Sequence, residues 1–236
     1  AVAMAGVSHP NVVIVYDAGT DTTAEGETAY LVMELLEGPS CSEVIASGRL
    51  LDFAEIARIG AGIAHGLAAA HAAGVVHRDI KPGNVVISRE VPTIVDFGIA
   101  RLEQETTATL TAPQTTIGTA AYMSPEQALG QHVGPASDVY SLGALLVALA
   151  SGSPPFGATN ALALMRAHID DSPPLLSDLR PGAPAPLTEL VDRMLAKDPA
   201  ARPTAAEVAA LLGGEDPDPA LAAVPPTAAV PPTAVL

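Results

Sequence analysis

The stretch HRDIKPGN at residues 77–84, followed by DFG at 96–98 and SPE at 124–126, decides the fold of this chain. A surface loop with chance charges and a Pro-Gly-Asn turn would account for any one of these residues. It does not account for three motifs in a fixed order, followed by SDVYSLG at 137–143. We therefore interpret the segment as a functional site carried on loops between rigid elements.

Four side chains of the first two motifs differ in chemistry and occur at fixed spacing. Asp79 can accept or orient the proton of a hydroxyl group, and Lys81 can neutralise charge on a phosphoryl group. Asn84 and Asp96 carry oxygen atoms that can hold Mg²⁺. This set is typical of a site for phosphoryl transfer, in which a protein mainly positions the reactants and neutralises charge.

Composition limits the remaining possibilities. A chain of 236 residues can form one domain of ordinary size, with or without a small second lobe. Its apolar fraction of 49% includes only 3% aromatic residues, so the core is expected to consist mainly of Ala, Val, Leu and Ile. A net charge of −15 disfavours binding to nucleic acid or to an anionic membrane surface.

Cysteine content and hydropathy indicate the compartment. Cys41 is the single cysteine and cannot form an internal disulfide, so we expect a reducing, cytoplasmic environment. The longest apolar run, residues 142–150, is half the length of a membrane span and predicts a buried helix. This segment is therefore expected to make no membrane contact, although a C-terminal extension could anchor a longer protein.

Hydrophobic periodicity gives a coarse secondary structure. Strands are expected at 12–19 and 29–38, joined by an acidic turn at 20–28, and a second strand pair at 85–88 and 93–98. Helices are expected at 42–47, 53–73, 137–152, 159–169, 186–196 and 204–212, with Ser137 or Asp138 capping the third. Residues 101–123 lack periodicity and predict a mobile surface segment.

The octapeptide, DFG, GTAAYMSPEQ at 118–127 and SDVYSLG together resemble the eukaryotic-type serine/threonine protein kinases, and closely their bacterial branch, over residues 4–212. The resemblance implies an α+β, protein-kinase-like fold. Residues 1–38 would be the hinge and a remnant of the β-rich N-lobe, namely the end of its helix and two strands. Residues 39–212 would be the mostly helical C-lobe, and the Pro/Ala-rich residues 213–236 a disordered linker.

The same resemblance implies an enzyme that uses ATP and Mg²⁺ to phosphorylate proteins. Asp79 and Lys81 would be catalytic, and Thr119 would bridge them, as in members that act on serine and threonine. Asn84 and Asp96 would bind the metal and thereby the nucleotide.

The adenine would lie against residues that spacing alone would assign to an ordinary core. Met33 would be the gatekeeper, and Val86 would pack against the ring. The backbone of Glu34 and Leu36 would make the hinge hydrogen bonds.

Other matching residues would have supporting roles. Arg78 would bind a phosphate placed on the activation segment, and Asp138 would fix the octapeptide loop from below. Glu126 would pair with Arg202. The candidate phosphate acceptors are Thr109, Thr111, Thr115 and Thr116, and the apolar stack between the lobes would comprise Met4, Val15, His77 and Phe97.

Part of the kinase pattern has no match. The family has a glycine-rich loop, GxGxxG, and a phosphate-binding lysine before the octapeptide. This chain contains no GxGxxG, and its two lysines, Lys81 and Lys197, do not lie before the octapeptide. We therefore expect a piece cut at its N-terminus and nearly inactive alone, from a parent kinase that acts on protein substrates. The resemblance also implies self-association of the chain for autophosphorylation.

Two alternatives remain open, a pseudokinase that serves as a scaffold and a small-molecule kinase of related fold. GAGIAHG at 60–66 superficially resembles a dinucleotide-binding motif, but its spacing is wrong and it lies within a helical pattern. We expect it to be a close-packing helix face. Cys41, His65, His71 and His132 are expected to be packing or surface residues.

Overall fold

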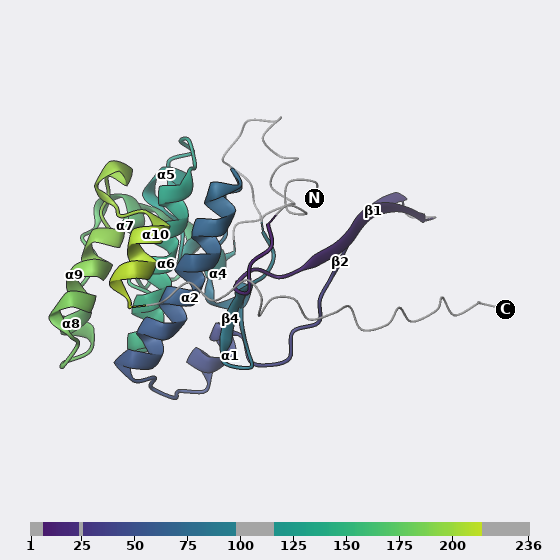
Figure 1. Ribbon diagram of the computed structural model, residues 1–236. Coiled ribbons are helices and arrows are strands. Elements are labelled where there is room, and N and C mark those ends of the chain that lie inside the picture. The colour runs from purple at the N-terminus through teal and green to yellow at the C-terminus, as the bar shows by residue number, and fades with distance from the viewer. Residues whose placement is uncertain (1–6, 24–25, 98–115, 214–236) are drawn as a thin grey trace.

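The protein is described by a computed structural model that covers residues 7–23, 26–97 and 116–213. Its helices gather into one body, and a two-stranded hairpin extends away from them (Figure 1). The predicted α+β fold with a mostly helical body is confirmed. Within the described ranges, none of the helices has both the length and the apolar character needed to cross a membrane.

The extended hairpin consists of β1 (Val15–Thr23) and β2 (Gly26–Met33), paired antiparallel. Both strands run through much of the stretch that we had predicted to be a turn. Threonine favours extended backbone, and the ladder of main-chain hydrogen bonds needs no apolar side chains. Tyr16 and Tyr30 are 60% and 47% exposed, so this hairpin buries little of its apolar surface.

A second antiparallel hairpin, β3 (Val85–Ser88) and β4 (Val91–Ile94), lies against the helical body. Its turn residues Arg89 and Glu90 both have positive φ, which matches the strand twist of a two-residue turn. Strand β4 begins and ends earlier than predicted, so residues 95–97 form a loop.

Residues 11–13 lie alongside β4. The amide of Val13 donates to the carbonyl of Ile94 at 2.9 Å, and the amide of Ile94 donates to the carbonyl of Asn11 at 2.9 Å. The amide nitrogen of Val95 donates to the carbonyl of Asn84 at 2.9 Å, so the two chain segments that carry Asn84 and Asp96 stay side by side.

The predicted helices form within about two residues of their expected bounds. The helices are α1 (Cys41–Ala46), α2 (Phe53–Ala72), α4 (Ile117–Ala120), α5 (Pro125–Ala128), α6 (Pro135–Ser151), α7 (Ala161–Asp170), α8 (Leu176–Leu179), α9 (Ala185–Met194) and α10 (Ala205–Leu211), with 3₁₀ turns at Pro82–Asn84 and Pro199–Ala201. The sequence did not predict α4, α5 and α8, because a single turn is too short to show periodicity.

Helix α6 is buried along almost its whole length and lies at the centre of the helical body. The predicted cap at Ser137 or Asp138 is wrong. The helix begins earlier, with Gly134 as its N-cap and Pro135 in its first turn. Ser137 and Asp138 are buried inside the helix and use their side chains for tertiary contacts instead.

The glycines of GAGIAHG form a close-packing face on α2, as expected. A β-carbon on Gly60 would lie 2.9 Å from side-chain atoms of Leu146, and one on Gly66 would lie 2.8 Å from the carbonyl oxygen of Asn11. These glycines therefore let α2 approach both α6 and the segment at 11–13.

Residues 98–115, with Thr109, Thr111 and Thr115, lie outside the described residues, as do Met4 and the linker from residue 214. The end of the predicted mobile surface segment is described, and residues 116–118 are exposed there. The prediction of a surface segment is wrong for Ala120, Ala121 and Met123, which are buried. Ala120 and Ala121 pack in a cluster with Phe156 and Leu164.

Gly38→Ala should destabilise the protein by about 3 kcal/mol, because a side chain there is strained and has no room. Gly38 has φ 141°, and its β-carbon would lie 2.1 Å from the carbonyl oxygen of Ile87. Gly48→Ala is the matched control, since Gly48 has φ 71° with nothing within 4 Å, and should cost about 1 kcal/mol. Urea unfolding measures both, and equal losses would contradict the steric explanation.

Candidate active site

The structure brings Asp79, Lys81 and Thr119 together. The Lys81 Nζ donates to Asp79 Oδ2 at 2.6 Å and to Thr119 Oγ1 at 3.2 Å. Side chains of Asp79 and Lys81 are 21% and 27% exposed, so the pair is partly buried yet open to a substrate. The Lys81 cation thus holds the carboxylate of Asp79 and the hydroxyl group of Thr119, which lies 38 residues further along the chain from Lys81.

Asn84 is fixed against the same carboxylate. Its Nδ2 donates to the Asp79 carbonyl oxygen at 2.9 Å and to Asp79 Oδ2 at 3.1 Å. Because the amide nitrogen is used in this way, Oδ1 is the atom that Asn84 can offer to a cation. Asp96 is exposed and has φ 55°, a left-handed conformation that is unusual for a residue other than glycine.

The donor chemistry of Asn84 and Asp96 fits Mg²⁺. In the part of the chain that the structure describes, His, Cys, Asp and Glu nowhere form a metal-binding group of three or more. Magnesium commonly binds through one or two protein oxygen ligands, with phosphate and water completing the octahedron. An amide oxygen and a carboxylate therefore suit a magnesium ion that also contacts a nucleotide.

Asp138 holds the octapeptide loop from below, as predicted. It is 1% exposed and accepts hydrogen bonds from the amide nitrogens of His77 at 2.9 Å and Arg78 at 2.8 Å. His71 Nε2 lies 2.8 Å from the same carboxylate. The sequence did not assign this contact to His71, because 67 residues separate it from Asp138.

His77 connects the octapeptide to the DFG segment. Its Nδ1 accepts from the amide nitrogen of Asp79 at 3.2 Å, so Nε2 carries the proton and donates to the carbonyl oxygen of Val95 at 3.0 Å. Burial lowers the pKa of His77 despite nearby carboxylates, which keeps the ring neutral. The ring lies 4.5 Å from that of Phe97, between centroids.

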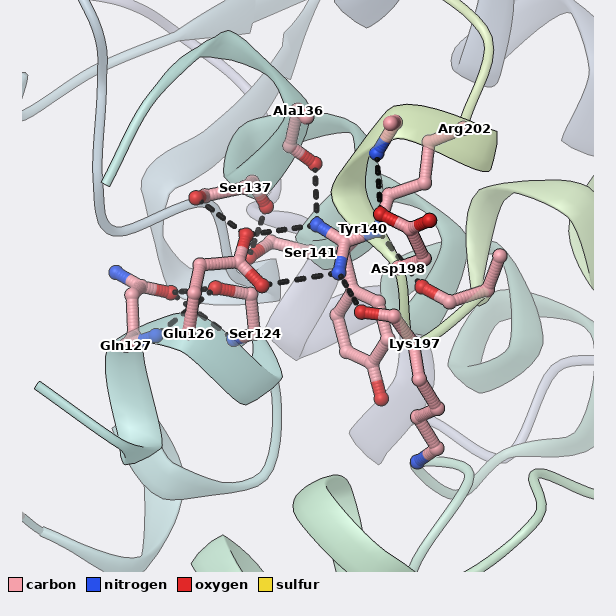
Figure 2. Close-up of polar contacts among 12 residues, drawn as sticks. Ser124, Glu126, Gln127, Ala136, Ser137, Tyr140, Ser141, Lys197, Asp198 and Arg202 are labelled. Atoms are coloured by element: carbon pink, nitrogen blue, oxygen red, sulfur yellow. Dashed lines mark hydrogen bonds and ion pairs between the residues drawn. The ribbon is translucent and has the colours of Figure 1, made fainter. Parts of the chain in front are cut away.

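Glu126 and Arg202 form the predicted buried pair. Their side chains meet through two hydrogen bonds of 2.7 and 2.9 Å (Figure 2). Arg202 also donates to three carbonyl oxygens, those of Ala136, Ala196 and Lys197. All five guanidinium N–H groups therefore have an acceptor.

The carboxylate of Glu126 is equally well satisfied. Ser137 Oγ donates to Glu126 Oε1 at 2.6 Å (Figure 2). Burial by itself disfavours the charged form, but hydrogen bonds from Arg202 and Ser137 outweigh it and lower the pKa of Glu126. The pair connects α5 to the turn before α10.

His168 is buried and makes two hydrogen bonds that were not predicted from the sequence. Its Nε2 donates to the carbonyl oxygen of Ala121 at 3.1 Å, and its Nδ1 accepts from the Tyr140 hydroxyl at 2.9 Å. Burial lowers the pKa of His168 to about 4. Helical spacing puts His168 on the same face of α7 as Leu164, a signal that could have indicated its burial.

Acidification should weaken the fold through His168. Because the unfolded histidine titrates near its ordinary pKa of about 6.5, the unfolded state binds a proton that folded His168 refuses until about pH 4. The free energy of unfolding should therefore fall between these pH values, by up to about 3 kcal/mol. Urea unfolding at several pH values checks this. His168→Gln should show a flatter dependence, and an equally steep one would contradict the assignment.

The hinge residues lie between β2 and α1. The amide of Glu34 donates to the carbonyl of Ile14 at 2.9 Å, so the carbonyl of Glu34 is the group that it can offer to a ligand. Ser40 forms an isolated bridge to Val86, which brings the end of the hinge segment against β3.

The chain belongs to the protein kinase domain family, which matches residues 1–211. It is 41% identical to the serine/threonine-protein kinase PknA of Mycobacterium tuberculosis over 227 residues, covering 89% of this chain and 49% of PknA. It is 36% identical to a probable serine/threonine-protein kinase PknB of Corynebacterium glutamicum, covering 88% of this chain and 33% of that protein. The predicted family is confirmed.

Solved structures agree. The PknI kinase domain of Mycobacterium tuberculosis is 28% identical and superposes with a TM-score of 0.68, covering 89% of this chain and 74% of that chain. The chain spans about half the length of PknA and a smaller part of PknB.

Proposed function

We propose that the protein transfers the γ-phosphate of ATP to serine and threonine hydroxyls of protein substrates. The observation that carries this proposal is the Lys81 ammonium group, which contacts both Asp79 and Thr119. This arrangement places a proton acceptor and a positive charge beside each other. Asn84 donates a hydrogen bond to the same carboxylate, that of Asp79. Phosphoryl transfer requires these elements and little covalent chemistry from the protein.

The residues have distinct roles in this proposal. Asp79 orients the substrate hydroxyl and takes its proton, and Lys81 neutralises charge that develops on the transferred group. Asn84 and Asp96 hold Mg²⁺, which supplies positive charge to the phosphate oxygens. Thr119 contacts Lys81 from the substrate side and favours serine and threonine as acceptors.

The nucleotide would lie between the hinge and β3. Met33 would border the adenine, and the carbonyl of Glu34 and the backbone of Leu36 would bind its edge. Val86, in the middle of β3, would pack against the ring. Residues 1–38 would accordingly act with the helical residues 39–212 around one nucleotide.

We also propose how the protein is regulated and where it acts. Arg78 would bind a phosphate on the activation segment, where Thr116 is an exposed candidate acceptor. The protein would act in the cytoplasm, with self-association as the route to autophosphorylation. The proposals for regulation rest on the family and on the position of Arg78 directly before Asp79, and the proposed location rests on the single cysteine, Cys41.

Two observations bear on the alternatives. The catalytic and metal-binding side chains of the octapeptide and DFG occur together, which favours an enzyme over a scaffold that has lost catalysis. The Glu126–Arg202 pair favours a protein substrate over a small molecule, since it anchors the SPE segment that kinases use for docking proteins.

Transfer of radiolabel from γ-labelled ATP tests the proposal. The full-length protein that carries residues 1–236 should label serine or threonine of a generic protein substrate, in a Mg²⁺-dependent manner. An aminoglycoside and choline serve as competing acceptors. Label in the small molecules alone would contradict the proposal, and no transfer to any acceptor would favour the scaffold.

A further inference from the structure

Gln127, directly after the anchored Glu126, uses both ends of its side-chain amide. Its Oε1 accepts from the amide nitrogen of Ser124 at 3.0 Å and from Ser124 Oγ at 3.1 Å, which closes a capping box at α5. Its Nε2 donates to the carbonyl oxygen of Arg78 at 2.7 Å. One side chain therefore caps a helix and reaches a loop 49 residues away.

The carbonyl that Gln127 binds belongs to a strained residue. Arg78 has φ 67°, a conformation that costs about 1 to 2 kcal/mol for a residue with a β-carbon. Such a conformation persists only where surrounding contacts hold it. Asp138 holds the amide nitrogen of Arg78 from one side, and Gln127 holds its carbonyl oxygen from the other.

The peptide group held by Gln127 is the one that joins Arg78 to Asp79. Its orientation sets the direction in which the Asp79 side chain leaves the backbone. Arg78, Asp79 and Gln127 also line one small hollow with Thr119, so this contact lies at the site and not behind it.

We infer that Gln127 is a positioning residue that couples the anchored SPE segment to the orientation of Asp79. The inference rests on the proposed function for its catalytic consequence, but its structural claim is independent of that function. An amide is required because one end must accept from Ser124 while the other donates to Arg78. Glutamate would complete the capping box equally well but could not donate.

Three variants of the full-length protein separate the two contacts. Gln127→Glu keeps the cap acceptor and removes the donor, and Gln127→Met removes the donor without adding charge. Ser124→Ala is the matched control, because it weakens the cap and leaves the contact to Arg78. For both Gln127 variants kcat should fall about tenfold or more, with KM for ATP and protein within about twofold of wild type. For Ser124→Ala, kcat should stay within about threefold of wild type while the melting temperature falls.

Hydrogen–deuterium exchange without nucleotide makes the test independent of activity. Amides of residues 77–84 should exchange about tenfold faster in both Gln127 variants than in wild type and in Ser124→Ala. If the wild type transfers no phosphate, the proposed function fails and the exchange result still decides this inference. If residues 77–84 exchange as slowly in both Gln127 variants as in wild type, the inference that Gln127 positions Asp79 is overturned.

Discussion

Asp79→Asn should lower kcat for phosphoryl transfer by about 10³-fold, the range expected when a general base is removed. Asparagine has nearly the shape of aspartate, but it cannot take the proton of the substrate hydroxyl. It also removes the negative charge that holds Lys81 Nζ at 2.6 Å, so the cation loses its position. Initial rates over a range of ATP and protein substrate concentrations measure the effect.

The fold should survive this substitution. Asp138 holds the amides of His77 and Arg78 irrespective of the residue at position 79. Asp192→Asn, on the exposed side of α9, is the control for loss of one carboxylate, and its kcat should equal that of wild type. A kcat within about tenfold of wild type for Asp79→Asn would assign proton transfer to another group.

Arg202→Met should destabilise the protein by about 3 to 5 kcal/mol. The substitution leaves Glu126, which is 4% exposed, as a buried carboxylate without its cation, and it frees three carbonyl acceptors. Urea unfolding at neutral pH measures the loss. Arg193→Met, at an exposed position, is the matched control and should change stability little.

The sign of the pH dependence follows from the lowered pKa of Glu126. A carboxyl group whose folded pKa is depressed stabilises the fold above its ordinary pKa, and this stabilisation is lost as pH falls through the folded pKa. The difference between wild type and Arg202→Met should therefore shrink in acid. The double variant Glu126→Gln with Arg202→Met should recover part of the loss. A double variant no more stable than Arg202→Met would contradict the buried-charge explanation.

Part of the site was predictable because its residues are close together in the sequence. Asp79, Lys81 and Asn84 lie within six consecutive residues, so a short loop of this composition brings their side chains together. Long helices were also predictable, because periodicity over several turns identifies them. The cap of α6 was mispredicted because Ser137 and Asp138 satisfy tertiary partners, which no local rule reveals.

Contacts between distant segments were known in advance only where the family resemblance supplied them. Thr119 beside Lys81, and Arg202 beside Glu126, join residues 38 and 76 positions apart. The sequence did not predict the contacts of His71, Gln127 and His168, because the resemblance assigned no role to these residues.

By itself, the sequence determined the family and the positions of the longer helices, and it predicted the chemistry of the octapeptide and DFG. The tertiary structure decided which buried side chains support that chemistry. The reason is physical, since the octapeptide loop satisfies its own polar groups only in part. Others are satisfied from elsewhere in the fold, as by Asp138 of α6 and Gln127 of α5.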